Sequence, residues 1–322
     1  MNSIRQIALV AMSLGLATLA SGQTTINSAN GYPWDLEYDS GAVDDGGNDA
    51  FDGYGYLVGV QVKDTNSTVL GQANYLSDFN LTLNGRTLST TAPMVVGGVS
   101  ISRQIFAPST TNYLRYFDTF TNTTGATVTL KVAFGGDLGS DSATTLAATS
   151  SGALTLSLAD YWAVTIQNNA LNAAGGPQGD PPVGVLFGNR NLLSFGSTNS
   201  EADIFSSGSA WTGDGDDGLS YVFGLTLAPG QSSSLMYFLY RGQSESGNGS
   251  EGETGGLAFG TNQVALASTT LANLAANPDL TGLTPTQIAQ VTNVAAVPEP
   301  STWALLVLGG VTLLTAARRR RA

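Results

Sequence analysis

Thr-Val-Thr-Leu-Lys-Val-Ala-Phe, residues 127–134, alternates large apolar side chains with smaller or polar ones, and this alternation decides the fold class. Val128, Leu130, Val132 and Phe134 share one face of an extended chain, and the residues between them share the other. We therefore predict a strand with one buried face. The same period of two returns in residues 154–158 and 221–227.

Turn residues separate further strands along the chain. Asn84-Gly85 lies between residues 79–83 and 86–88 and predicts a two-residue hairpin, and residues 121–125 predict a second turn. The other strand candidates are residues 95–106, 113–120, 162–167, 183–187 and 235–240. About ten strands at short spacing predict a mainly β fold, an antiparallel β-sandwich, and exclude a parallel α/β sheet.

Changes in composition divide the chain into segments. Residues 23–242 are expected to form the β-sandwich ectodomain, with residues 24–53 as an irregular first part rich in Gly, Asn and Asp. Residues 243–256 are a loop or linker rich in Gly, Ser and Glu. The segment 257–296 has helical spacing and predicts short helices over 262–276 and 285–294, the second starting at Thr284-Pro285. These helices would pack on the sandwich or form a stalk.

Composition excludes much catalytic chemistry. The 322 residues suffice for one large domain or two small ones, and 42% of them are hydrophobic. Only 11% are charged, against about a quarter in an average chain, so uncharged polar residues must cover the surface. The chain has no His and no Cys. This excludes Ser-His-Asp and Cys-His triads, zinc sites built on His or Cys, haem and Fe–S ligation, and disulfides.

The N-terminus has the parts of a secretory signal peptide over residues 1–22. Arg5 precedes an apolar stretch over residues 7–20, and small residues follow up to Gly22, which predicts cleavage before Gln23. The alternative is a buried N-terminal helix. We favour the signal peptide because Ser13 alone interrupts the apolar residues from Ile7 to Leu16.

The C-terminus has the features of a membrane anchor. An apolar run from Trp303 to residue 317 is followed by four arginines, Arg318, Arg319, Arg320 and Arg321. A helix over residues 301–317 would be ~26 Å long, close to the ~30 Å hydrocarbon layer. Trp303 suits the membrane interface, and the arginines should keep their end in the cytoplasm. An ordinary single-pass anchor is the simplest interpretation.

Val297, Pro298, Glu299 and Pro300 come directly before this run, and the two prolines keep the segment extended. The motif, the apolar helix and the arginine cluster, residues 297–322, resemble the PEP-CTERM sorting domain. The resemblance implies processing by an exosortase, a membrane enzyme of Gram-negative bacteria that make exopolysaccharide. It also implies that Pro298, Glu299 and Pro300 are recognition residues, and that this chain is the substrate. Residues 113–141, 160–165 and 225–239 look like parts of a secreted bacterial β-sandwich domain of unassigned activity.

The exported part is strongly acidic. Without Arg5, the terminal arginines and Glu299 it has seven basic and 23 acidic residues, a net charge of −16. Nucleic acid is excluded as a partner, because no basic stripe is present to neutralise phosphates. Divalent cations are the natural counter-ions, and acidic polysaccharide would be repelled unless calcium bridges the two.

Two acidic clusters are candidate Ca²⁺ sites, since Ca²⁺ prefers oxygen ligands. Their members are Asp44, Asp45, Asn48, Asp49 and Asp52 in the first cluster and Asp214, Asp216 and Asp217 in the second. The spacing matches neither an EF-hand nor a nonapeptide calcium repeat. The competing interpretation of each cluster is a solvated turn.

A carbohydrate-active enzyme is the main alternative function. A glycosidase needs two carboxylates across a sugar, and the candidates are Asp118, Asp137, Asp141, Asp160 and Asp203. Asp137 and Asp141 are expected in a tight turn. An aromatic platform for sugar rings could form from Tyr32, Trp34, Tyr54 and Tyr56, although such residues more often belong to a core.

The expected function is that of an exported, exosortase-processed surface or extracellular-matrix protein. It would be anchored in the inner membrane before processing and have a structural or adhesive role with exopolysaccharide, as in a biofilm matrix. A carboxylate-based enzyme and a calcium-dependent carbohydrate-binding module remain the alternatives.

Overall fold

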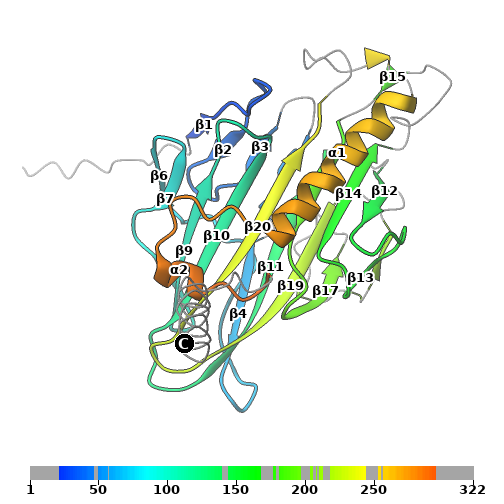
Figure 1. The fold of residues 1–322 in the computed structure, drawn as a ribbon. Coiled ribbons are helices and arrows are strands. Elements are labelled where there is room, and N and C mark those ends of the chain that lie inside the picture. Colours follow the sequence, from blue (N-terminus) through cyan, green and yellow to red (C-terminus); the bar gives the residue numbers. More distant parts are fainter. Residues whose placement is uncertain are drawn as a thin grey trace, which may run out of the picture.

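The fold is taken from a computed structural model of the chain (Figure 1). It describes residues 22–46, 50–56, 58–139, 144–167, 177–178, 181–196, 204–205, 208, 210–212, 218–243, 253–254 and 257–294. Both predicted terminal signals and most of residues 243–256 lie outside this part of the chain. The described part consists mainly of antiparallel β-sheets with two helices, as the alternation predicts.

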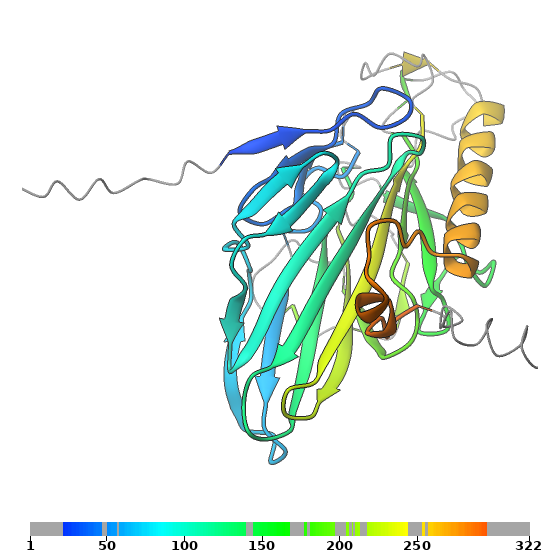
Figure 2. The ribbon, with the colours of Figure 1, turned by 60° about the vertical axis from the view of Figure 1, so that its left-hand side comes forward.

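Two large sheets lie face to face (Figure 2). The larger sheet contains, in order, β12 (Thr144–Thr149), β14 (Trp162–Gln167), β16 (Val183–Leu186), β20 (Ser232–Arg241), β10 (Tyr113–Asn122), β9 (Val99–Phe106), β7 (Thr87–Thr90) and β6 (Leu81–Asn84), with β8 (Met94–Val96) paired to β9. The smaller sheet contains β17 (Leu192–Gly196), β19 (Gly218–Leu227), β11 (Val128–Asp137), β4 (Gly59–Lys63) and β5 (Val69–Ala73). One hydrophobic core fills the space between them.

The decisive alternation at residues 127–134 forms most of β11. Val128, Leu130, Val132 and Phe134 are buried in the core between the sheets, and Thr129 on the other face is exposed. The alternation of exposure ends at Ala133, which is also buried because Ile204 and Phe205 cover the outer face there. One buried face is therefore confirmed, and the second is covered by a segment distant in sequence.

Two predictions from the strand pattern need correction. Residues 95–106 form two strands, because Gly97 and Gly98 both have positive φ and turn the chain so that β8 pairs back on β9. In residues 154–158 only β13 (Leu156–Ser157) is a strand, paired with β18 (Ala210–Trp211), and Leu154 is 67% exposed. The predicted hairpin is confirmed between β6 and β7, but its two-residue turn is Gly85-Arg86, because Asn84 is the last residue of β6 and pairs with Thr87; Gly85 has φ +61°.

The first part of the ectodomain is more regular than predicted. β1 (Gln23–Thr25), β2 (Asp35–Glu37) and β3 (Val43–Asp45) form a three-stranded sheet beside the larger sheets (Figure 1). Trp34, Leu36 and Val43 are buried in the main core, so tertiary packing orders these three-residue strands. A further short pair joins β15 (Pro177–Gln178) to β21 (Glu253–Thr254).

Helix α1 (Leu257–Ala276) lies across the outer face of the larger sheet (Figure 1). Its Leu271 and Leu274 pack on outward residues of the sheet such as Met236 and Phe238 of β20. Alternate residues of β20 therefore face the inner core or the helix, and both faces of this strand are buried. The helical segment packs on the sheet and does not form a stalk.

Helix α2 (Pro285–Ala289) starts where the sequence predicts and ends earlier. Thr284 caps it, with a reciprocal hydrogen bond to Gln287 and Pro285 in the first turn. The prediction of helix to residue 294 is wrong, because residues 290–294 run along β20. The Ser234 N–H donates to the Gln290 carbonyl (2.7 Å), and the Thr292 N–H donates to the Ser234 carbonyl (3.0 Å). β16 ends opposite Phe238, and this tail takes the place that it leaves beside β20.

Neither helix in the described ranges is both long and apolar enough to cross a membrane. The helix predicted over residues 301–317 lies outside them.

Candidate functional site

The C-terminal end of the described chain is tied firmly to the larger sheet. Asn293 is fully buried, and its amide nitrogen donates to the carbonyls of Phe187 (2.6 Å) and Met236 (2.7 Å). Its side-chain oxygen accepts from the Met236 N–H (2.9 Å). Asn293 thus joins the turn after β16, β20 and the tail in one hydrogen-bonded unit. Val294 follows at 3% exposure and is the last described residue before the predicted motif.

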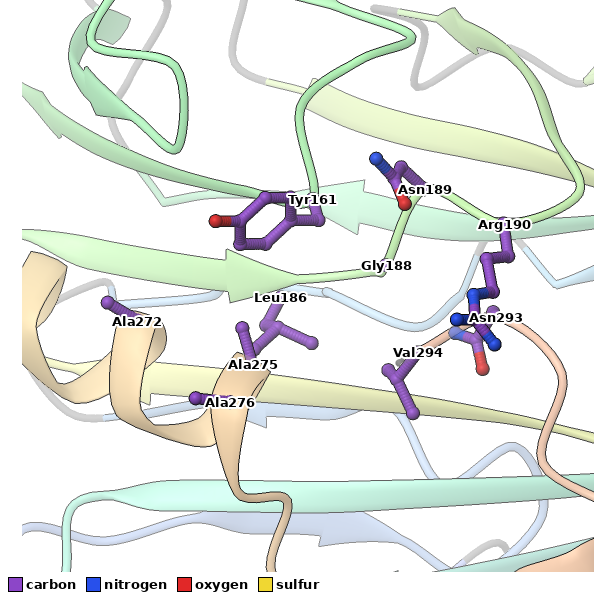
Figure 3. A pocket seen from close by; sticks show the side chains of 10 residues that line it. All are labelled: Tyr161, Leu186, Gly188, Asn189, Arg190, Ala272, Ala275, Ala276, Asn293 and Val294. Atoms are coloured by element: carbon purple, nitrogen blue, oxygen red, sulfur yellow. The ribbon is translucent and has the colours of Figure 1, made fainter. Parts of the chain in front are cut away.

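A cavity of about 320 Å³ lies beside this unit (Figure 3). Five segments build it: the residue before β14, the end of β16, the turn after β16, the last turn of α1 and the tail. The lining residues are Tyr161, Leu186, Gly188, Asn189, Arg190, Ala272, Ala275, Ala276, Asn293 and Val294.

The lining combines an apolar floor with a polar rim. Leu186 and Val294 are buried, and the alanines of α1 leave room above them. Tyr161 is 37% exposed and borders one side, while Arg190 lies near Asn293 on the other (Figure 3). No carboxylate is among the described lining residues, and Arg190 is their one charged side chain.

The walls of the cavity are held by the backbone. The Tyr161 carbonyl accepts from the N–H groups of Phe187 (3.1 Å) and Gly188 (3.0 Å), and the Arg190 N–H donates to the Asn293 carbonyl (3.2 Å). A Cβ at Gly188 would lie 2.2 Å from the Asn293 carbonyl oxygen, and φ there is +71°. Only glycine fits where the turn and the tail approach this closely.

Asp118 was a candidate for a catalytic carboxylate and is instead half of a buried ion pair. Arg103 donates to both of its oxygens (2.8 and 2.7 Å) and to the Ser40 carbonyl (2.8 Å). The guanidinium also lies over the ring of Phe79, 4.6 Å from its centroid. Burial lowers the pKa of Arg103, but the charge and hydrogen bonds of Asp118 outweigh burial and raise the pKa. The pair is a cross-link between β9 and β10 inside the core.

The other described candidates also have structural partners. Asp160 is buried and accepts hydrogen bonds from Ser150, Ser151 and Ser157 over 2.8 to 3.0 Å. Burial raises the pKa of Asp160, but these hydrogen bonds outweigh it and hold the pKa below its ordinary value. Asp137 accepts from the Gly139 N–H (2.7 Å), which confirms the tight turn. Asp141 and Asp203 lie outside the described residues.

The four aromatic residues considered for a sugar platform do not form one. Tyr32, Trp34 and Tyr54 are buried, and Tyr56 alone of the four is exposed, at 38%, with its hydroxyl bonded to Glu37. The three buried rings belong to the core, which confirms the favoured interpretation. The short strands β1 to β3 cover this region, and they were not predicted.

The Tyr32 ring supports a buried arginine. The guanidinium carbon of Arg241 lies 3.7 Å from the centroid of the Tyr32 ring, and Arg241 is fully buried. Within the described part of the chain, its Nε and both terminal nitrogens have no hydrogen-bond acceptor. Burial lowers the pKa of Arg241 to about 10, so it is charged at neutral pH.

The acidic clusters are described only in part. Asp44 and Asp45 end β3 and Asp52 lies in the following turn, whereas Asn48, Asp49, Asp214, Asp216 and Asp217 fall outside the described residues. In the described ranges, no three His, Cys, Asp or Glu residues are placed to hold a metal ion. Calcium binding stays a prediction. The predicted sorting residues, Val297, Pro298, Glu299, Pro300, Trp303 and Arg318, Arg319, Arg320 and Arg321, likewise lie outside the described residues.

The architecture defines a class of protein: an antiparallel β ectodomain whose last described residues lead directly to a C-terminal signal. The PEP-CTERM protein-sorting motif matches residues 296–321, so the chain carries this sorting signal. The motif implies an exported exosortase substrate that is anchored in a membrane before processing.

No curated protein matches the chain in sequence. Among solved structures, the chain is similar to a polysaccharide lyase, with a TM-score of 0.36 and 14% identity over 67% of this chain and 29% of that one. It is also similar to the GH36 α-galactosidase AgaA from Geobacillus stearothermophilus, with a TM-score of 0.31 and 12% identity over 63% of this chain and 31% of that one. The chain thus spans about a third of these structures. At these TM-scores, neither similarity is evidence for an activity of this chain.

The sequence did not reveal the cavity residues. They come from five separate segments, and neither their spacing nor their chemistry forms a motif. The alanines at positions 272, 275 and 276 suit one face of a helix, which is as typical of packing as of a site.

Proposed function

We propose that the chain is an exported, exosortase-processed protein of the cell surface or extracellular matrix, with a structural or adhesive role in association with exopolysaccharide. The observation that carries this proposal is the sorting motif at residues 296–321. A sorting motif makes the chain a substrate of the processing enzyme, and the remaining ectodomain is the delivered product.

The end of the described chain supports this role. The hydrogen bonds of Asn293 and the burial of Val294 tie the tail to the sheet before the motif begins. Cleavage at the motif would therefore leave every described contact of the ectodomain intact. An enzyme is less favoured, since Asp118, Asp137 and Asp160 each have partners typical of structural carboxylates.

Fractionation of producing cells tests the proposal. In a strain with an intact exosortase we expect a shortened form at the surface or in the matrix, detected by an antibody against the ectodomain. Deletion of the exosortase, or Glu299→Ala in the motif, should leave full-length chain with its arginine tail in the inner membrane. Arg190→Ala, outside the motif, is the matched control and should be processed normally. Full-length protein retained in the membrane of the intact strain would refute the sorting role.

A further inference from the structure

We propose that the cavity bordered by Tyr161, Arg190 and the last turn of α1 binds a neutral hexose unit of a polysaccharide. This inference rests on the proposed function, because exopolysaccharide would surround the exported protein. The cavity has a volume of about 320 Å³, which is at the lower end of the range for small-molecule sites, ≈ 300 Å³ and above. Such a volume suits a sugar ring and part of its neighbour better than a long ligand.

The groups around the cavity match the surface of a sugar. Tyr161 is partly exposed and offers an aromatic face to the apolar face of a pyranose ring, with a hydroxyl at its edge. Arg190 and Asn189 are exposed at the rim and supply N–H donors to hydroxyl oxygens.

The floor is shaped to admit a ring. Ala272 and Ala276, which are exposed, and the half-buried Ala275 come from the C-terminal end of α1, and Gly188 lies in the turn opposite. Protein interiors are usually close-packed. Larger side chains at these positions would fill the space, so the small residues keep the cavity open. Leu186 and Val294 form a buried apolar base under it.

Charge favours a neutral ligand. The exported part has a net charge of −16, so its field opposes the approach of an acidic polymer. The C-terminal end of α1 adds a partial negative charge at the cavity, and Arg190 is the one cation among the described lining residues. A neutral sugar avoids this opposition and still uses the guanidinium as a donor.

Calorimetric titration of the full-length chain in mild detergent tests the site. The probes are maltohexaose, cellohexaose and mannohexaose, with hexagalacturonate as the acidic comparison. We expect at least one neutral hexaose to bind, and Tyr161→Ala and Ala272→Leu each to weaken it tenfold or more. Ala272→Leu fills the space, and leucine is also a good helix former. The melting temperature of this variant should therefore stay close to that of the wild type.

Two further variants make the result specific. Tyr161→Phe keeps the ring and should retain most of the affinity. Tyr56→Ala removes a tyrosine of matched exposure, 38% against 37%, outside the cavity, and should bind as the wild type does. Binding unchanged in Tyr161→Ala and Ala272→Leu would overturn the proposal, as would binding of hexagalacturonate alone or of none of the sugars. If sorting is normal when sugar binding fails, only this site is refuted; failed sorting refutes the proposed function.

Discussion

Arg241 and Arg103 show how differently two buried guanidinium groups are supported. Arg103 has a bidentate partner in Asp118, whereas the described acceptors leave the nitrogens of Arg241 without a hydrogen bond. Burying a charge costs free energy unless a partner compensates it. The ring of Tyr32 offsets only part of that cost.

Arg241→Met should therefore leave the free energy of unfolding unchanged or raise it by about 1–2 kcal/mol, since it removes a desolvated cation and keeps the volume. Arg103→Met should lower it by about 3–5 kcal/mol, because Asp118 is left buried and uncompensated. Urea unfolding measures both. Equal losses in the two variants would show that Arg241 has a strong partner and would contradict this account.

At the level of elements, strands with a regular alternation of residues could be predicted from the sequence. Elements that depend on pairing with a distant segment could not. β10, β11, β14, β16 and β20 were found from the sequence because each carries a run of apolar or alternating residues. The tail 290–294 was predicted as helix because the spacing of the whole segment 285–294 is helical, but Val291, Thr292 and Val294 are β-branched, and pairing with β20 makes the tail extended. β1 to β3 were missed for the same reason, since their order comes from burial of Trp34, Leu36 and Val43.

The cavity could not be predicted at all. Its position depends on where β16 ends relative to β20 and on how α1 crosses the sheet. Neither relation is encoded in a local pattern, whereas the sorting motif is one continuous segment and was predicted from the sequence alone.

Asn293→Ala tests the hydrogen-bonded unit formed by the tail, β16 and β20. The change leaves the Met236 N–H and two carbonyls without their partner, so we expect the free energy of unfolding to fall by about 2–3 kcal/mol. Asn273→Ala, at an exposed position of α1, is the matched control and should be neutral or slightly stabilising. Guanidinium unfolding followed by tryptophan fluorescence gives both values, and a neutral Asn293→Ala would mean that the tail does not hold the sheet.

For the whole molecule, acid sensitivity follows from its carboxylates. The pKa of Asp160 is lowered in the folded chain, because its hydrogen bonds outweigh the opposite effect of burial. The pKa of Asp279 is lowered as well, where burial is outweighed by hydrogen bonds from Thr281 and Tyr113 and by the charge of Arg115. A depressed folded pKa contributes stability that is present above the unfolded pKa and lost as the pH falls through the folded value.

We therefore expect the free energy of unfolding to fall below about pH 4. Asp160→Asn should be less stable than the wild type by about 1–3 kcal/mol at pH 6, and the difference should shrink as the pH is lowered below 4. Thermal unfolding from pH 3 to pH 7 measures it. If the difference in the free energy of unfolding between the wild type and Asp160→Asn grew as the pH was lowered, the pKa of Asp160 would not be lowered in the folded chain.

The tail beside β20 also sets an order of events. A polypeptide that leaves the cytoplasm from its N-terminus delivers residues 290–294 after every strand of the larger sheet, immediately ahead of the sorting motif. The larger sheet is complete only when residues 290–294, which precede the sorting motif, pair with β20. On the proposed function, cleavage at the motif would leave residues 290–294 with the ectodomain, because the motif begins only at residue 296, so the processed chain would keep the segment that completes its larger sheet.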